Sequence, residues 1–154
     1  MHRIIALILI ITSLSSFTGC ESFGETRFSD IEEGEAFGHN IDGYHKKLPH
    51  NYCLFVLLGE TTRLIKVPDN MLDKDYFLES VYNTPPVLKG RYIKGYYNDD
   101  YLILYEQLSL DSYEYILFDF TTQEINRYER KKDLPDYKSI KWFSLCNTLQ
   151  EKYN

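Results

Sequence analysis

Carboxylates close together in sequence are the side chains here that are best suited to acid–base chemistry. Glu106, Asp111, Glu114 and Asp119 lie in or beside two apolar runs. Two carboxylates that face each other across paired strands can serve as general acid and base, as in glycoside hydrolysis. Nothing in the spacing of these four requires them to meet. We therefore expect no catalytic site among them and no enzyme activity.

Histidines and adjacent aspartates raise the question of a metal site. His39, His45 and His50 fall within twelve residues, and neutral imidazole is a common transition-metal ligand. Their spacing fits no helical face, and no Cys-x-x-Cys pair accompanies them. Asp99 and Asp100 are neighbours, which point to opposite faces of a strand, so a turn explains them better. We expect no metal and no cofactor.

The N-terminus has the pattern of an export signal. Met1-His2-Arg3 is a short basic start, and the apolar stretch Ile4–Leu14 that follows is eleven residues long. A bilayer takes about 20 residues, so this stretch is too short to span one but has the length of a signal-peptide core. Small residues then lead to Cys20.

The segment Ser15-Ser16-Phe17-Thr18-Gly19-Cys20 resembles the lipobox of bacterial lipoproteins. The resemblance implies that residues 1–19 are a signal peptide and that Cys20 receives a diacylglycerol. Cys20 then becomes the first residue of the mature chain, with an amine that is often acylated. The resulting protein is exported and anchored to a bacterial membrane, on its periplasmic or surface face. An ordinary secretory leader cut nearby and an uncleaved anchor are the alternatives.

Charge excludes one class of partner. The chain carries a formal charge of −6, and loss of the leader with Arg3 makes it −7. Nucleic-acid binding needs clustered Lys and Arg, so we expect no nucleic acid.

Acidic residues dominate Glu21–Glu35 without a sustained period, which predicts a flexible tether over residues 20–38.

Two further cysteines, Cys53 and Cys146, remain after lipidation of Cys20. An oxidising compartment permits a disulfide between them, closing a loop of about 90 residues. Both also lie beside apolar residues, where cysteine often acts as a small buried hydrophobe. A disulfide and two buried free thiols are therefore both open.

The elements that must position these residues are mainly strands. Closely spaced apolar runs predict an antiparallel meander over Arg91–Tyr97, Tyr101–Gln107, Tyr113–Phe120 and Ile125–Tyr128. The apolar pattern also predicts a hairpin over Asn51–Leu58 and Arg63–Val67 and a short helix over Asp73–Val81. For the tail, Tyr137–Leu149, it predicts either a helix or a strand followed by a helical turn.

The expected fold is mainly β (α+β), with one domain over residues 39–154. It is an antiparallel meander or a small curled sheet or barrel, with one or two short helices. Because both faces of the meander carry bulky residues, a helix or a second sheet covering the other side is the alternative to a closed barrel.

A second resemblance lies in the meander. The residues that carry it are Tyr97-Asn98-Asp99-Asp100-Tyr101, then Gln107 at the end of the first strand, and then Tyr115-Ile116-Leu117-Phe118-Asp119. This part of the chain is similar to short bacterial lipoproteins of a domain-of-unknown-function family. The similarity covers Tyr92–Asp133. It implies the fold and the anchor and no activity.

These observations favour a non-enzymatic binding or accessory protein of the cell envelope. Tyr is frequent, with 14 of 154 residues, and a tyrosine-rich sheet can dock a protein partner. The alternative is an inhibitor or immunity-type protein that neutralises a toxin or lytic enzyme, since an acidic surface can steer toward a basic enzyme.

Overall fold

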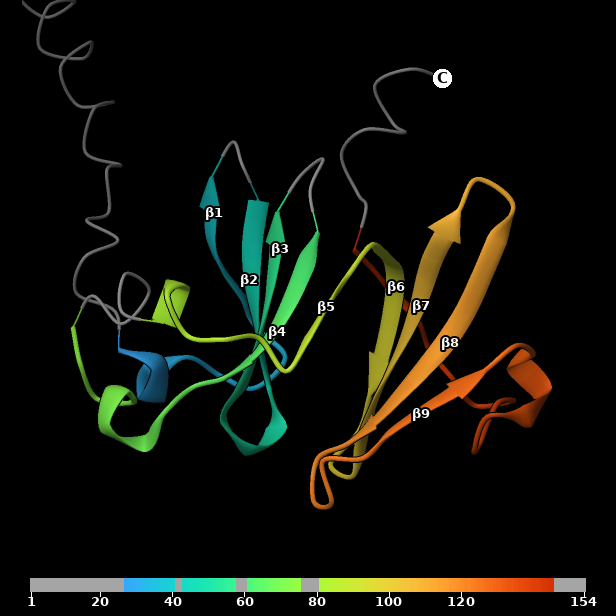
Figure 1. Cartoon of the computed structure of the whole chain (residues 1–154). Coiled ribbons are helices and arrows are strands. Elements are labelled where there is room, and N and C mark those ends of the chain that lie inside the picture. Colours follow the sequence, from blue (N-terminus) through green and yellow to red (C-terminus); the bar gives the residue numbers. More distant parts are fainter. Residues whose placement is uncertain (1–26, 41–42, 58–60, 76–80, 146–154) are drawn as a thin grey trace, which may run out of the picture.

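Two antiparallel sheets of five strands each form the protein (Figure 1). The structure is a computed structural model and describes residues 27–40, 43–57, 61–75 and 81–145. The predicted class, mainly β, is confirmed. The two sheets do not close into a barrel over these residues. No helix within the described ranges is both long enough and apolar enough to cross a membrane.

The first sheet has the strand order β1-β2-β3-β4-β5. Its strands are β1 (Ala36–Asn40), β2 (Gly43–Leu48), β3 (Tyr52–Leu57), β4 (Thr62–Lys66) and β5 (Leu88–Gly90). The predicted hairpin is confirmed as β3 and β4, and the side chains from Tyr52 to Val56 are all buried, as a continuous apolar run indicates.

The second sheet has the order β10-β6-β7-β8-β9. Its strands are β6 (Tyr92–Tyr97), β7 (Tyr101–Ser109), β8 (Ser112–Asp119), β9 (Ile125–Tyr128) and β10 (Phe143–Ser144). All four predicted meander strands are confirmed. One residue, Arg91, separates β5 from β6, so the chain passes directly from the first sheet to the second.

Four short 3-10 turns complete the described structure. They are η1 (Phe28–Asp30), η2 (Pro49–Asn51), η3 (Asp69–Met71) and η4 (Lys131–Asp133). Of the helix predicted at Asp73–Val81, residues 76–80 lie outside the described residues, and Val81 has helical backbone. The tail prediction is settled only at its start, where β10 is a strand; the residues from 146 onward lie outside the described part.

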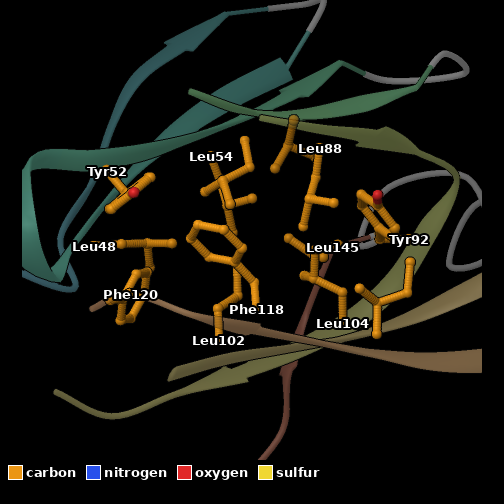
Figure 2. Close-up of a cluster of buried hydrophobic side chains, with 13 residues drawn as sticks. Leu48, Tyr52, Leu54, Leu88, Tyr92, Leu102, Leu104, Phe118, Phe120 and Leu145 are labelled. Carbon is orange, nitrogen blue, oxygen red and sulfur yellow. The ribbon is translucent and has the colours of Figure 1, made fainter. Parts of the chain in front are cut away.

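The main core fills the space between the two sheets (Figure 2). Alternate residues of each strand point inward because the side-chain period of a strand is two. The first sheet contributes Leu48, Tyr52, Leu54, Val56, Leu64 and Leu88, and the second sheet with its C-terminal extension contributes Tyr92, Leu102, Leu104, Ile116, Phe118, Phe120 and Leu145. Because the two sheets share this core, they form one folding unit.

The outer face of the first sheet has a smaller core of its own. Cys53, Phe55 and Ile65 pack there against Phe28 and Ile31 from the N-terminal segment. The Lys47 ammonium holds that segment in place, donating to the backbone oxygens of Phe28 at 2.9 Å and Ile31 at 2.6 Å.

This packing corrects the predicted tether. Phe28 is fully buried, Ile31 is 5% exposed, and β1 starts at Ala36. Residues 28–38 therefore belong to the folded domain, and the predicted boundary at residue 39 is wrong. The scattered apolar residues had no period because they pack from a 3-10 turn and a loop instead of a regular element.

Candidate functional site

The outer face of the second sheet carries a row of aromatic side chains. Its members are Tyr105 on β7, Tyr113 and Tyr115 on β8, and Trp142 in the segment leading to β10. On β7 and β8 these tyrosines alternate with inward residues such as Leu104 and Ile116, and Tyr105 pairs directly with Tyr115. We call Tyr105, Tyr113, Tyr115 and Trp142, together with Lys94 and Lys131, the aromatic face.

Each ring of the aromatic face contacts the next ring along the row. Tyr105 and Tyr113 are stacked, with ring centroids 5.3 Å apart and planes 7° from parallel. Tyr105 and Tyr115 lie 4.8 Å apart, and Tyr115 lies 6.1 Å from Trp142. Such pairs stabilise each other beyond simple burial. The row is therefore a connected cluster of rings that are mostly only partly exposed, and two of them, Tyr115 and Trp142, also pack against a small buried cluster of Ile103, Leu117, Leu134 and Ile140.

Two lysines add positive charge to the row. The Lys94 ammonium lies 4.8 Å from the centroid of Tyr105 and 4.7 Å from that of Trp142, and Lys131 lies 6.0 Å from Trp142. Burial lowers the pKa of Lys94, and the nearby charge of Lys131 lowers it further. Burial also raises the pKa of the Tyr115 hydroxyl. The face thus offers ring surfaces, neutral hydroxyls and ammonium donors, which suit recognition.

A hairpin extends from the same sheet and exposes apolar side chains. We call Leu108–Ser112, which comprises the turn between β7 and β8 and the strand residues that flank it, the hairpin tip. Leu110 is 86% exposed and Leu108 is 55% exposed. Figure 1 shows the β7–β8 hairpin reaching past the neighbouring strands.

Side-chain hydrogen bonds brace the hairpin tip. The Tyr113 hydroxyl donates to the Leu110 backbone oxygen at 3.2 Å and accepts from the Gln107 amide at 3.3 Å. Ser109 pairs with Ser112, so the turn itself consists of Leu110 and Asp111. The tip is held in one shape by these bonds and by the stacking of Tyr113 on Tyr105.

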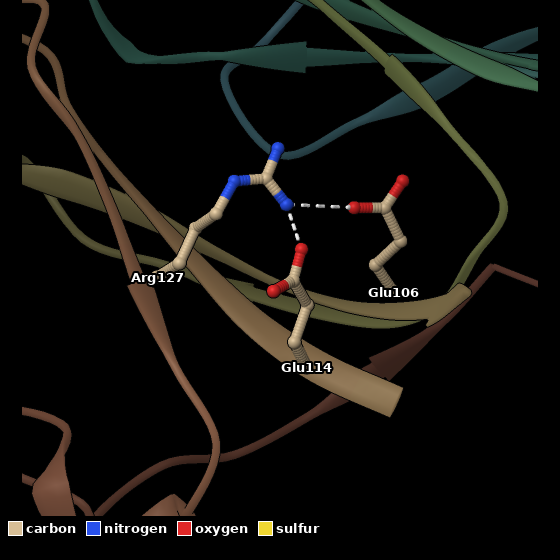
Figure 3. Close-up of polar contacts among 3 residues, drawn as sticks. All are labelled: Glu106, Glu114 and Arg127. Atoms are coloured by element: carbon tan, nitrogen blue, oxygen red, sulfur yellow. Dashed lines mark hydrogen bonds and ion pairs between the residues drawn. The ribbon is translucent and has the colours of Figure 1, made fainter. Parts of the chain in front are cut away.

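The structure does bring two of the candidate carboxylates together (Figure 3). Glu106 and Glu114 are directly paired across β7 and β8, on the inner side of the second sheet. Nη1 of Arg127 on β9 lies 3.4 Å from Oε2 of Glu106 and also forms an ion pair with Glu114. The glutamate side chains are only 12% and 17% exposed, and the arginine is 54% exposed.

This arrangement is that of a structural ion pair. One guanidinium contacts both carboxylates, so its single positive charge offsets part of their combined negative charge. An inward-pointing charge on an edge strand is also a common way to prevent pairing with other chains. The cluster therefore favours a stabilising role over an acid–base site.

The other candidate aspartates serve turns. Asn98 Oδ1 accepts hydrogen bonds from the amides of Asp100 and Tyr101 at 3.0 Å and 2.9 Å, which confirms the turn predicted at Asp99 and Asp100. Asp119 Oδ1 accepts from the amides of the next two threonines at 2.8 Å and 2.7 Å, and these bonds lower the pKa of Asp119. Asp111 is exposed at the hairpin tip.

His45 and His50, the two candidate histidines with described side chains, do not converge on one site. His45 lies between Phe37 and Phe55, with ring centroids 5.4 Å and 4.5 Å away, whereas Nε2 of His50 is 2.7 Å from the backbone oxygen of Asp99. The side chain of His39 lies outside the described part. Within that part, no three His, Cys, Asp or Glu side chains are grouped so that they can hold a metal ion.

The predicted lipidation site, Cys20, lies outside the described residues. So does Cys146, one of the two cysteines of the possible disulfide. Cys53 is a free, buried thiol in the structure, and burial raises its pKa. It packs on the outer face of the first sheet, while Leu145 packs in the core between the sheets. The disulfide and the lipid anchor stay predictions.

The sequence indicated the tyrosine-rich sheet but not five of the residues described above. Trp142, Lys94 and Lys131 join the face through the fold, and no sequence spacing relates them to Tyr105. The exposed Leu108 and Leu110 had a usable signal, because leucines stood where a hairpin connection calls for polar or glycine residues.

Comparison of the chain with protein-family models, curated proteins and solved structures finds no match.

Proposed function

We propose that the chain is an exported lipoprotein, anchored to a membrane through Cys20, that acts as a non-enzymatic binding or accessory protein of the cell envelope. The observation that carries the binding role is the aromatic face. Tyrosine, tryptophan and a basic side chain clustered on a rigid sheet are typical of contact surfaces, where Tyr and Trp supply much of the binding energy. The ion-paired state of Glu106 and Glu114 favours the non-enzymatic reading.

The anchor is tested by its chemistry. Labelling with a fatty-acid analogue should modify the wild-type chain and leave Cys20→Ala unlabelled. Two or three acyl chains bury enough methylene groups, at about 0.8 kcal/mol each, for stable membrane attachment. An unlabelled wild type would refute the lipoprotein part of the proposal.

Binding is tested with a crosslinked pull-down of the native lipidated chain, with Cys20→Ala as the soluble control. Recovery of proteins that assemble the envelope would support the accessory role. If neither form recovers a partner, the binding role is wrong.

The aromatic face is tested by Lys94→Ala, because Lys94 contacts two of its rings. The variant should weaken binding of the recovered partner at least about fivefold. Lys89→Ala, an exposed lysine on β5 of the other sheet, is the matched control and should bind normally. Trp142 is the single tryptophan of the chain, so its fluorescence reports directly on this surface.

An inhibitor or immunity-type protein is the second candidate function. The hairpin tip favours it, because a narrow projecting loop with exposed leucines and Asp111 suits insertion into the cleft of an enzyme. Under this reading the pull-down recovers one stoichiometric hydrolase or toxin, and an equimolar amount of the chain abolishes that protein's activity.

A further inference from the structure

We propose that the hairpin tip is the element that enters the partner, and that the partner is a protein with an apolar pocket surrounded by basic side chains. This inference rests on the binding role proposed above and names the chemistry of what is bound.

The first argument is that the tip breaks a local rule of folding. Two-residue hairpin turns favour Asn-Gly or Asp-Gly, whereas here Leu110 and Asp111 form the turn and neither has a positive φ. The strand register also shifts between Gln107 and Ser109. Leu110 is 86% exposed and so adds little to the fold. Departures from local preference are expected where a residue serves function.

The second argument is that the tip is prepared for binding. The hydroxyl of Tyr113 bonds to Leu110 and to Gln107, and its ring stacks on Tyr105. A loop already held in one conformation loses less entropy on association. A narrow convex tip with two exposed leucines requires a concave apolar site as its complement.

The third argument is charge, which selects a protein over a membrane. Asp111 stands beside Leu110 at the turn, and the whole chain carries −6. A carboxylate at the tip opposes entry into hydrocarbon, and anionic lipid repels an anionic protein. The same charges attract a basic rim around an apolar pocket.

Leu110→Asn separates a binding role from a folding role. Asparagine is a preferred turn residue, so thermal stability should stay the same or rise, while affinity for the partner should fall about tenfold or more. Val87→Asn is the matched control: Val87 is 37% exposed and precedes β5, and its replacement should leave affinity unchanged.

A photo-crosslinking residue at Ser112 in the full-length anchored chain, expressed in its native host, identifies the occupant. A second chain carries it at Lys131 on the aromatic face, and a third at Lys89. We expect a discrete protein adduct from Ser112 that Leu110→Asn reduces about tenfold, that added salt weakens, and whose captured protein is basic.

Each other result overturns the inference in a distinguishable way. An adduct from Lys131 but none from Ser112 refutes the role of the tip and leaves the proposed binding function intact. No adduct from either position refutes both. A lipid adduct from Ser112 that Leu110→Asn reduces assigns the tip to a membrane and refutes a protein occupant. An acidic captured protein, or an adduct unaffected by Leu110→Asn, refutes the stated chemistry.

Discussion

Replacing Arg127 with Met should destabilise the protein through the two glutamates that it leaves behind. Glu106 and Glu114 face each other on paired strands, and directly opposed side chains have Cβ atoms about 5 Å apart. Two like charges at that distance repel by about 3 kcal/mol at an effective dielectric constant of about 20. Partial exposure of Arg127 reduces its contribution, so we expect the free energy of unfolding to fall by about 1 to 3 kcal/mol.

The measurement is urea unfolding followed by Trp142 fluorescence and by circular dichroism. Arg130→Met is the matched control, since Arg130 pairs with Asp133 on the surface, where the side chains are 65% and 37% exposed. Exposed pairs of this kind contribute at most about 1 kcal/mol, so the control should change stability little.

The reasoning is checked by repeating Arg127→Met in a chain that already carries Glu106→Gln and Glu114→Gln. Without the two negative charges, removal of the arginine should cost at least about 1 kcal/mol less than in the wild type. If the loss is the same in both backgrounds, Arg127 stabilises the sheet by packing and the electrostatic account is wrong.

Three further predictions concern turns, burial and pH. Burial raises the pKa of Tyr52, Tyr97 and Tyr115, so their contribution to stability is fully present below about pH 10 and is lost as the pH rises further. A free energy of unfolding in urea that is no lower at about pH 11 than at about pH 9 would contradict this. Hydrogen bonds from backbone amides lower the pKa of Asp119, so the stabilisation that these bonds provide is present above about pH 4 and is lost as the pH falls further. Asp119→Ala should therefore lower the melting temperature at pH 7 and remove this loss of stability in acid. If the variant loses stability in acid as the wild type does, the account of Asp119 is wrong. Gly90→Ala places a methyl group against the Glu106 carboxylate and 2.7 Å from Cζ of buried Tyr92, so it should lower the free energy of unfolding in urea by about 1 to 3 kcal/mol. Lys89→Ala, at the neighbouring exposed residue, is the control, and an equal loss of stability in the two variants would refute the clash.

Strand periodicity predicted the meander and the first hairpin because those runs bury residues on two faces. It missed β1, β2 and β5, and it left β10 open as one of two alternatives for Tyr137–Leu149. β2 places lysines among its central positions, where Lys46 and Lys47 bond to the N-terminal segment, so its apolar signal is weak. β5 and β10 are too short to show a period.

The candidate site was predictable only in part. Alternation along β7 and β8 indicated a tyrosine-bearing face, and that face is present. Trp142 reaches Tyr115 through the return of the C-terminal segment to β6, a long-range pairing that local patterns do not encode. The carboxylate pair likewise depended on strand register, which sequence spacing alone did not fix.

For the binding role proposed above, the described sheet edges favour contact through side chains over strand addition. Each edge strand has a feature that opposes pairing with another chain: β1 has an irregular register, β5 and β10 have three and two residues, and β9 points Arg127 inward. A chain protected at its edges in this way still exposes Leu108 and Leu110 at a turn. Because exposed leucines at the end of a hairpin favour association and add little to the fold, their presence beside four protected edges supports the proposal that a partner covers them.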